Sequence, residues 1–134
     1  SSPAIKVTGQ ACPLFVPLVE ENWGKKPAAE LIAREYLKGV EKSGADTVIL
    51  GCTHYPVLKS LIAKILGKKV KLVDSAQTLA QTAQQFLAAH QCAEIKGKGK
   101  LTVYASDDPQ KFKQQAAILL GEKPSSVRLK KLNV

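Results

Sequence analysis

The sequence contains little that would place the protein in a membrane or outside the cell. No apolar run approaches the ~20 residues that a helix needs to cross a bilayer. The start, residues 1–4, lacks the charged and then apolar pattern of a signal peptide. The three cysteines are odd in number and do not form a closed disulfide framework. We therefore expect a soluble, cytoplasmic protein in a reducing compartment.

Aromatic side chains are also scarce, at 5% of the residues. The chain is basic, with 20 Lys and Arg against 11 Asp and Glu and a formal net charge of +9, so it attracts polyanions weakly. Nucleic-acid bases would find little to stack on, and no recognised nucleic-acid module is present. These features disfavour nucleic acid as the main partner.

The chain does have enough apolar material for a core, because 45% of its 134 residues are hydrophobic. Disorder is therefore a poor description of this chain. The length fits one compact domain, or one lobe plus part of another from a longer chain. Composition alone does not separate these two cases.

Hydrophobic periodicity predicts alternating strands and helices. The expected strands cover residues 4–11, 47–51, 69–73 and 101–105, with an edge strand or extended tail at 127–130. The expected helices cover residues 28–42, 56–66, 76–91 and 109–120, and a short helix or turn is expected within 14–19. The order strand, helix, strand predicts an α/β fold, a three-layer αβα arrangement with a mainly parallel sheet.

The pattern also predicts which side chains are buried. The strand at residues 47–51 is a continuous β-branched run, typical of a parallel strand buried on both faces. The helices carry apolar residues at helical spacing that we expect to face the core: Leu31, Ile32, Leu37 and Val40; Leu79, Ala83, Phe86 and Leu87; Phe112, Ala116 and Leu119. The glycine-rich, basic residues 96–100 predict a turn or hinge.

The most informative stretch is Gly51-Cys52-Thr53-His54-Tyr55-Pro56, where a buried strand ends and a helix begins. In an open α/β sheet, ligands bind outside the carboxyl ends of the strands, so we expect Cys52 where substrates bind. The free amides and positive end of the following helix favour a thiolate, and His54 is placed to exchange a proton with it. Such a pair suits proton transfer near neutral pH.

Two other interpretations of Cys52 stay open at this point. A cysteine after an apolar strand is often a small buried hydrophobic residue, although the polar turn around it favours chemistry. A metal site would have only Cys52 and His54 as ligands, because Cys12, Cys92 and His90 stand alone in the sequence. We therefore expect no metal.

The same motif closely resembles the second half of glutamate racemase, together with residues 46–50 before it and Val73-Asp74-Ser75-Ala76 after it. Residues 11–21, which begin Ala-Cys-Pro-Leu-Phe-Val-Pro, resemble that family too. The match runs in the family's order from about residue 5 to residue 76, and the remaining segments look like the family's carboxyl end. The motif is distinctive because related amino-acid racemases replace its histidine.

This resemblance implies a cofactor-independent racemase that interconverts L- and D-glutamate and supplies D-glutamate for bacterial peptidoglycan, and so for cell wall biogenesis and cell shape. It implies two lobes that each contribute one catalytic cysteine, since two acid–base groups must flank the Cα. By resemblance, Cys52 is one of these groups, His54 assists its proton transfer and Glu20 tunes it. Thr53 is implied in binding the substrate's amino-acid end, in keeping with carboxylate binding at a helix start.

The sequence departs from the family in having no counterpart of the amino-terminal half with the first catalytic cysteine. We expect residues 1–73 to form the lobe that carries Cys52, and residues 74–134 to complete the amino-terminal lobe. The chain would cross between lobes near Asp74, a residue that helix capping also explains. The expected partners are glutamate and either the missing lobe or a second copy, because residues 76–134 would otherwise expose apolar surface.

Two alternative functions stay open. One is a racemase for another small amino acid such as aspartate, which His54 disfavours. The other is a non-catalytic anion-binding module that uses the basic surface. Replacement of Cys52 in a two-lobe enzyme would abolish turnover by a racemase, whereas a charge-driven module would show binding that falls steeply with salt.

We predict that the isolated chain does not racemise glutamate, because neither Cys12 nor Cys92 is a convincing replacement for the first catalytic cysteine. Cys12 lies in a motif that the family treats as structural, and Cys92 lies in a polar stretch with no base beside it. An assay of D-glutamate formation by the purified chain checks this, and clear turnover would contradict it.

Overall fold

The computed structural model describes residues 4–92, 101–121 and 123–131. The chain divides into two compact units, Ser1–Leu87 and Ala88–Val134, which we describe separately. The turn or hinge expected at residues 96–100 lies outside the described residues. The boundary expected between residues 73 and 74 separates the two lobes of a complete enzyme, not these two units, and it stays a prediction.

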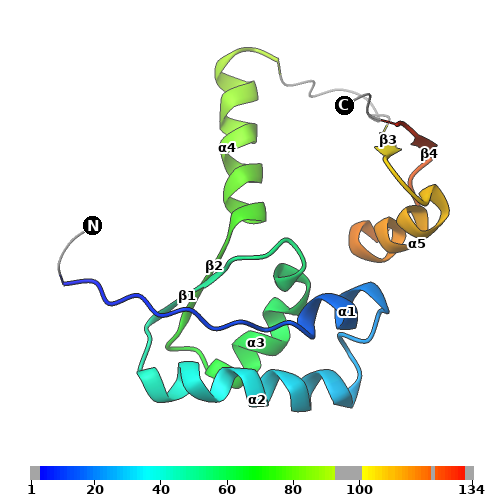
Figure 1. Cartoon of the computed structure of the whole chain (residues 1–134). Coiled ribbons are helices and arrows are strands. Elements are labelled where there is room, and N and C mark those ends of the chain that lie inside the picture. The colour runs from blue at the N-terminus through cyan, green and yellow to red at the C-terminus, as the bar shows by residue number, and fades with distance from the viewer. Residues whose placement is uncertain (1–3, 93–100, 122, 132–134) are drawn as a thin grey trace. The chain divides into compact units, whose positions relative to one another are not determined.

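The first unit holds most of the regular structure. Its elements are α1 (Phe15–Glu20), α2 (Pro27–Ser43), β1 (Thr47–Leu50), the 3-10 helix η1 (Tyr55–Leu58), α3 (Lys59–Leu66), β2 (Lys71–Asp74) and most of α4 (Ser75–Ala89) (Figure 1). The helix expected at residues 56–66 is therefore present as a 3-10 turn followed by an α-helix. The other boundaries lie within one or two residues of those expected.

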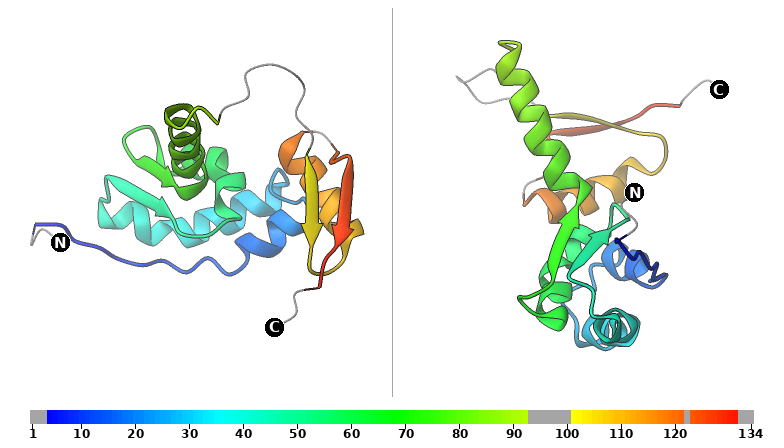
Figure 2. Two further views of the ribbon diagram at one scale, coloured as in Figure 1. Left: turned by 90° about the horizontal axis from the view of Figure 1, so that it is seen from above. Right: turned by 90° about the vertical axis from the view of Figure 1, so that its left-hand side faces the viewer.

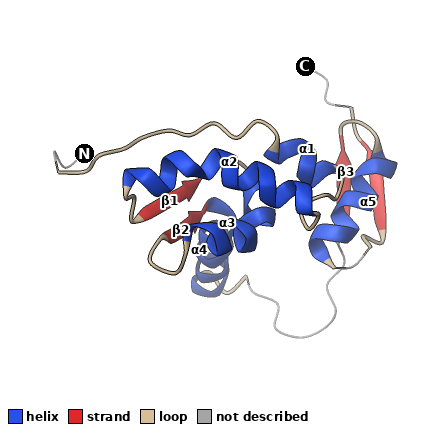
Figure 3. Ribbon diagram, turned by 90° about the horizontal axis from the view of Figure 1, so that it is seen from below, coloured by secondary structure: helices blue, strands red, loops and turns tan. Residues whose placement is uncertain are grey.

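Strands β1 and β2 form a parallel pair, with Thr47 opposite Lys71 and Leu50 opposite Asp74. The connection between them contains η1 and α3, so this part is the predicted strand–helix–strand unit. Figure 3 shows the two strands side by side. The structure confirms the α/β fold class.

The core of the first unit gathers side chains from α1, α2, β1, η1 and α3. Phe15, Leu58 and Ile62 are its largest fully buried side chains, each at most 2% exposed. On α2, the residues that are buried in this core are Ala29, Ala33 and Leu37, spaced four apart, and the partly buried Ile32, Tyr36 and Val40 pack against it. The two alanines are 0% exposed, because small side chains let the neighbouring elements approach α2 closely.

Three burial predictions for the first unit are wrong. Leu31 is 70% exposed, because α2 turns its small residues rather than this leucine to the core. Ile49 of β1 is 74% exposed, so only one face of this strand is covered by the described residues. The apolar residues of α4 predicted to face inward, including Leu79 and Phe86, are exposed, and no residue of α4 is buried.

The strand expected at residues 4–11 is also absent from the described structure, where this segment is extended but irregular. A strand needs a neighbouring ladder of hydrogen bonds. Among the described residues, no backbone hydrogen bond joins residues 5–10 to another element. Residues 5–10 therefore have the extended conformation that their sequence favours, with no strand paired to them among the described residues.

The second unit contains β3 (Thr102–Ala105), α5 (Pro109–Leu120) and β4 (Ser126–Leu129). The two strands are parallel, with Thr102 opposite Ser126, and the carboxyl-terminal strand is thus confirmed (Figure 2). Asp108 begins α5 by accepting a hydrogen bond from the Lys111 amide at 2.9 Å. Ala116 is buried as predicted, whereas Leu119 is 57% exposed, so this prediction is wrong.

No helix within the three described ranges combines the length and the apolar character required to span a bilayer.

We predict that Ile62→Ala destabilises the first unit by about 2–5 kcal/mol, because it opens a cavity at a side chain that is only 1% exposed. Leu31→Ala is the control: it also shortens an aliphatic side chain on a helix, but at an exposed position, and should change stability by less than about 0.5 kcal/mol. Urea unfolding followed by circular dichroism measures both. Equal losses in the two variants would contradict the described core.

Candidate functional site

The candidate site lies in the turn that follows β1. Leu50 ends the strand in the core, at 4% exposure, and residues 51–54 then reverse the chain toward η1. The Tyr55 amide donates to the Cys52 carbonyl at 3.2 Å, and the Val57 amide donates to the His54 carbonyl at 3.1 Å. Pro56 lies in the first turn of η1, where its missing N–H costs nothing. The turn thus holds Cys52, Thr53 and His54 at the carboxyl end of a parallel strand.

The His54 ring contacts polar groups through both of its nitrogens. Its Nδ1 lies 3.9 Å from the Cys52 sulfur and 3.3 Å from the Thr53 hydroxyl oxygen. Its Nε2 lies 3.4 Å from a carboxylate oxygen of Glu20. When the ring proton is on Nε2, toward the carboxylate, Nδ1 is left as an acceptor for the thiol. The structure therefore brings together all four residues that the sequence analysis selected.

Glu20 reaches this turn from α1, a helix that the core holds in place. Phe15 at the start of α1 is 1% exposed, and its ring packs edge-on against Tyr55, with ring centres 5.3 Å apart. The Tyr55 hydroxyl donates a hydrogen bond to the Cys12 carbonyl at 3.2 Å. Burial, more than the neighbouring thiols, raises the pKa of Tyr55, so the phenol stays a donor at neutral pH. Tyr55 thereby fixes the turn to the segment before α1.

Exposure separates the three cysteines. Cys12 is 5% exposed, and burial raises the pKa of its thiol. Cys52 is half-buried, beside His54 and Glu20 side chains that are 32% and 38% exposed. Cys92 is exposed in the second unit. The description of a small buried hydrophobic residue therefore fits Cys12, whereas Cys52 is reachable from solvent.

Asp74 lies at the same end of the sheet, opposite Leu50 in the parallel register. Its side chain is almost fully buried, accepts a hydrogen bond from Lys59 Nζ at 2.6 Å, and caps α4 by accepting from the Gln77 amide at 2.8 Å. The Lys59 ammonium, followed by the Gln77 amide, lowers the pKa of this carboxyl. Asp74 is therefore a charged helix cap, in agreement with the helix capping that the sequence suggested for this residue.

No three His, Cys, Asp or Glu side chains of the described ranges are grouped so that they could hold a metal ion. The chemistry that this turn offers is proton transfer between a thiol, an imidazole and a carboxylate.

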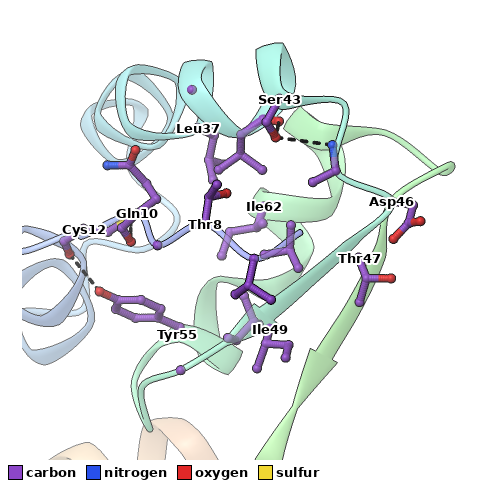
Figure 4. Close-up of a pocket in the computed structure, with 18 of the residues that line it drawn as sticks. Thr8, Gln10, Cys12, Leu37, Ser43, Asp46, Thr47, Ile49, Tyr55 and Ile62 are labelled. Atoms are coloured by element: carbon purple, nitrogen blue, oxygen red, sulfur yellow. Dashed lines mark hydrogen bonds between the residues drawn. The ribbon is translucent and has the colours of Figure 1, made fainter. Parts of the chain in front are cut away.

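A cavity of about 700 Å³, which no sequence pattern predicts, lies beside the candidate site. Residues 5–10, the end of α2 and strand β1 line it (Figure 4). Gly51 and Tyr55 border the cavity, but Cys52 does not. The cavity and the cysteine turn are therefore adjacent features with different linings.

Residues 5–83 of the chain match the family described as Asp/Glu/Hydantoin racemase. The glutamate racemase of Geobacter metallireducens is 41% identical over 127 residues, which are 94% of this chain and 47% of that protein. The glutamate racemase of Chlorobaculum parvum is 39% identical over 127 residues. The chain thus spans about half the length of the curated relatives it matches.

Solved structures agree with these relatives. The structure of glutamate racemase isoform RacE1 from Bacillus anthracis has a TM-score of 0.84 at 29% identity, over 99% of this chain and 50% of that one. The glutamate racemase of Francisella tularensis in complex with D-glutamate has a TM-score of 0.83 at 31% identity, over 98% and 49%. The fold is therefore shared with half of each of these proteins.

We predict that Asp74→Asn lowers the melting temperature at neutral pH, because it removes the charge that pairs with Lys59. An unfolded Asp has a pKa of about 3.9, and the folded value is lower. The carboxylate therefore contributes stability above about pH 4 and loses it as the pH falls through the folded pKa. The difference between variant and wild type should accordingly narrow in acid.

Asp46→Asn is the matched control, since Asp46 carries the same side chain at an exposed position beside β1. Melting temperatures of the three proteins between neutral pH and pH 3 check the prediction. A difference between Asp74→Asn and wild type that does not change with pH would contradict it.

Proposed function

Because the chain belongs to the Asp/Glu/hydantoin racemase family, we propose that it is the part of a glutamate racemase that supplies one of two proton-transfer groups. The resemblance to glutamate racemase is confirmed by the relatives. The observation that carries the proposal is the placement of the accessible Cys52 sulfur 3.9 Å from His54 Nδ1, with Glu20 at the other ring nitrogen.

Racemisation requires that a proton leave Cα on one face and that another arrive on the opposite face. In the proposed reaction the Cys52 thiolate takes the Cα proton and becomes a thiol, while an acid on the other face delivers a proton to the carbanion. In the reverse direction the Cys52 thiol is the donor. His54 exchanges the proton with the Cys52 sulfur through Nδ1, and Glu20 holds the ring and balances its charge.

The resemblance to glutamate racemase implies that Thr53 binds the substrate. Its side chain is exposed beside the Cys52 and His54 side chains, and its hydroxyl lies 3.3 Å from His54 Nδ1. We assign it to binding the amino-acid end of the substrate. The Francisella tularensis relative forms a complex with D-glutamate, and the relatives cited above are glutamate racemases, so glutamate is the proposed substrate. We further propose that the enzyme is cytoplasmic and that it supplies D-glutamate for peptidoglycan synthesis.

We propose that the second proton-transfer group comes from outside the described part of this chain. Cys12 is buried with a raised pKa, which does not suit a thiol that shuttles protons. We propose that the half of the relatives that this chain does not match carries the second group. Residues 74–134 are proposed to complete that other lobe, which would cover apolar side chains now exposed on α4 and α5: Leu79, Phe86, Leu87, Ile118, Leu119 and Leu120.

We predict that the chain becomes active when it is co-expressed with the half of the Geobacter metallireducens glutamate racemase that it does not match, here called the complementary half. In this complex, Cys52→Ser should lower kcat for glutamate racemisation by at least about 100-fold, because a hydroxyl does not ionise near neutral pH. D-glutamate formation and the exchange of the Cα proton with solvent deuterium measure this effect.

Cys92→Ser is the matched control and should leave kcat unchanged, since Cys92 is exposed in the second unit. Melting temperatures of both variants show that the fold is kept. Full activity of the Cys52→Ser complex would overturn the proposed role of Cys52.

A further inference from the structure

The cavity beside the candidate site has the form of a groove between two extended segments. Strand β1 forms one wall and residues 5–10 form the other. Apolar side chains from α1, α2 and α3 complete its lining: Phe15, Leu37, Val40 and Ile62. In Figures 2 and 4, residues 5–10 lie on the side of β1 away from β2. The groove therefore opens along the edge of β1 that β2 leaves free.

The backbone of β1 presents hydrogen-bonding groups to this groove. In the described ranges β1 pairs with β2 and with no other strand. The Asp46 carbonyl accepts from the Lys71 amide at 2.8 Å, so Asp46 faces β2. Successive residues of a strand direct their N–H and C=O groups to opposite edges. Thr47 and Ile49 therefore direct theirs to the free edge.

The opposite wall also has no strand paired to it among the described residues. Within the described structure, no backbone hydrogen bond connects residues 5–10 with another element. Ile5 and Val7 on this wall are 68% and 83% exposed, and Ile49 on the β1 wall is 74% exposed. Apolar side chains on both walls and unpaired backbone groups are the features of a sheet from which one strand is missing.

We infer that this groove receives a β-strand from the complementary half, which pairs with the free edge of β1. The inference rests on the proposed function, in which a second half completes the enzyme. The Thr-Val-Ile-Leu run of β1 is typical of an interior strand rather than an edge strand. The chain covers 47% of the Geobacter metallireducens relative, so the complementary half is long enough to supply such a strand. The groove is thus an assembly surface, distinct from the cysteine turn.

Backbone amide exchange tests the inference directly. Hydrogen–deuterium exchange is followed by NMR in the chain alone and after addition of the purified complementary half of the Geobacter metallireducens enzyme. We expect the Thr47 and Ile49 amides to exchange at least about tenfold more slowly in the complex, because a new hydrogen bond must open first. The Leu72 amide, which faces the other edge of the sheet, is the internal reference and should change less.

A complex without added protection at Thr47 and Ile49 would overturn the inference, and so would failure to form a complex. Protection that increases with the concentration of the chain alone would also overturn it, since a second copy would then occupy the edge. The assay of D-glutamate formation separates this result from the proposed function. D-glutamate formation without slower exchange of the Thr47 and Ile49 amides would support the proposed racemase function and contradict the inferred strand.

A pair of variants gives a second measurement. Ile49→Pro removes one N–H that faces the groove and leaves the β1–β2 hydrogen bonds intact. It should weaken binding of the complementary half by at least about tenfold. Ile49→Val keeps the N–H and a β-branched side chain, and should bind as wild type does. Equal affinity of the two variants would contradict the inference, and if Ile49→Pro fails to fold, the exchange measurement on the wild-type chain decides.

Discussion

The geometry of the candidate site depends on the packing of the Phe15 ring. This ring touches Tyr36 of α2 and Tyr55 of η1 edge to face, and Tyr55 in turn bonds the Cys12 carbonyl. One buried side chain thus joins three helices, and each ring pair adds about 0.5–1.5 kcal/mol to the burial energy. The pair of His54 and Glu20 is partly exposed, so it contributes less to stability. The core therefore positions the polar residues of the candidate site, which are partly exposed at its surface.

The predictions from the sequence succeed for the strands and helices and fail for several faces that were expected to be buried. The positions of the strands and helices, and with them the α/β fold class, follow from periodicity and turn residues, which are local features of the sequence. The sequence pattern predicts that the apolar face of α4 and the β-branched run of β1 are buried, yet Leu79 and Ile49 are exposed. Periodicity reports the surface that a side chain is suited to meet, and in the proposed two-lobe enzyme that surface belongs to the complementary half.

The residues of the candidate site also differ in how readily the sequence identifies them. Cys52, Thr53 and His54 are consecutive, so the end of one strand was enough to find them. Glu20 lies 34 positions before His54, and only the family resemblance connected the two residues. The hydrogen bond from Tyr55 to Cys12 was not predicted, although a tyrosine beside an apolar turn needs a partner for its hydroxyl. The groove could not be predicted, because it depends on how two extended segments far apart in the sequence lie relative to each other in the fold.

The charged cap at Asp74 has a mechanical consequence for the helix that follows it. Lys59 and Asp74 fix the base of α4, whereas no residue further along this helix is buried. The 15 residues of α4 extend about 22 Å at 1.5 Å per residue. A tilt of about 10° at the base would displace the far end by about 4 Å over that length. The ion pair of Lys59 and Asp74 thus lies at the point about which α4 would tilt. A small change in the position of this pair would move the far end of the helix by a larger distance.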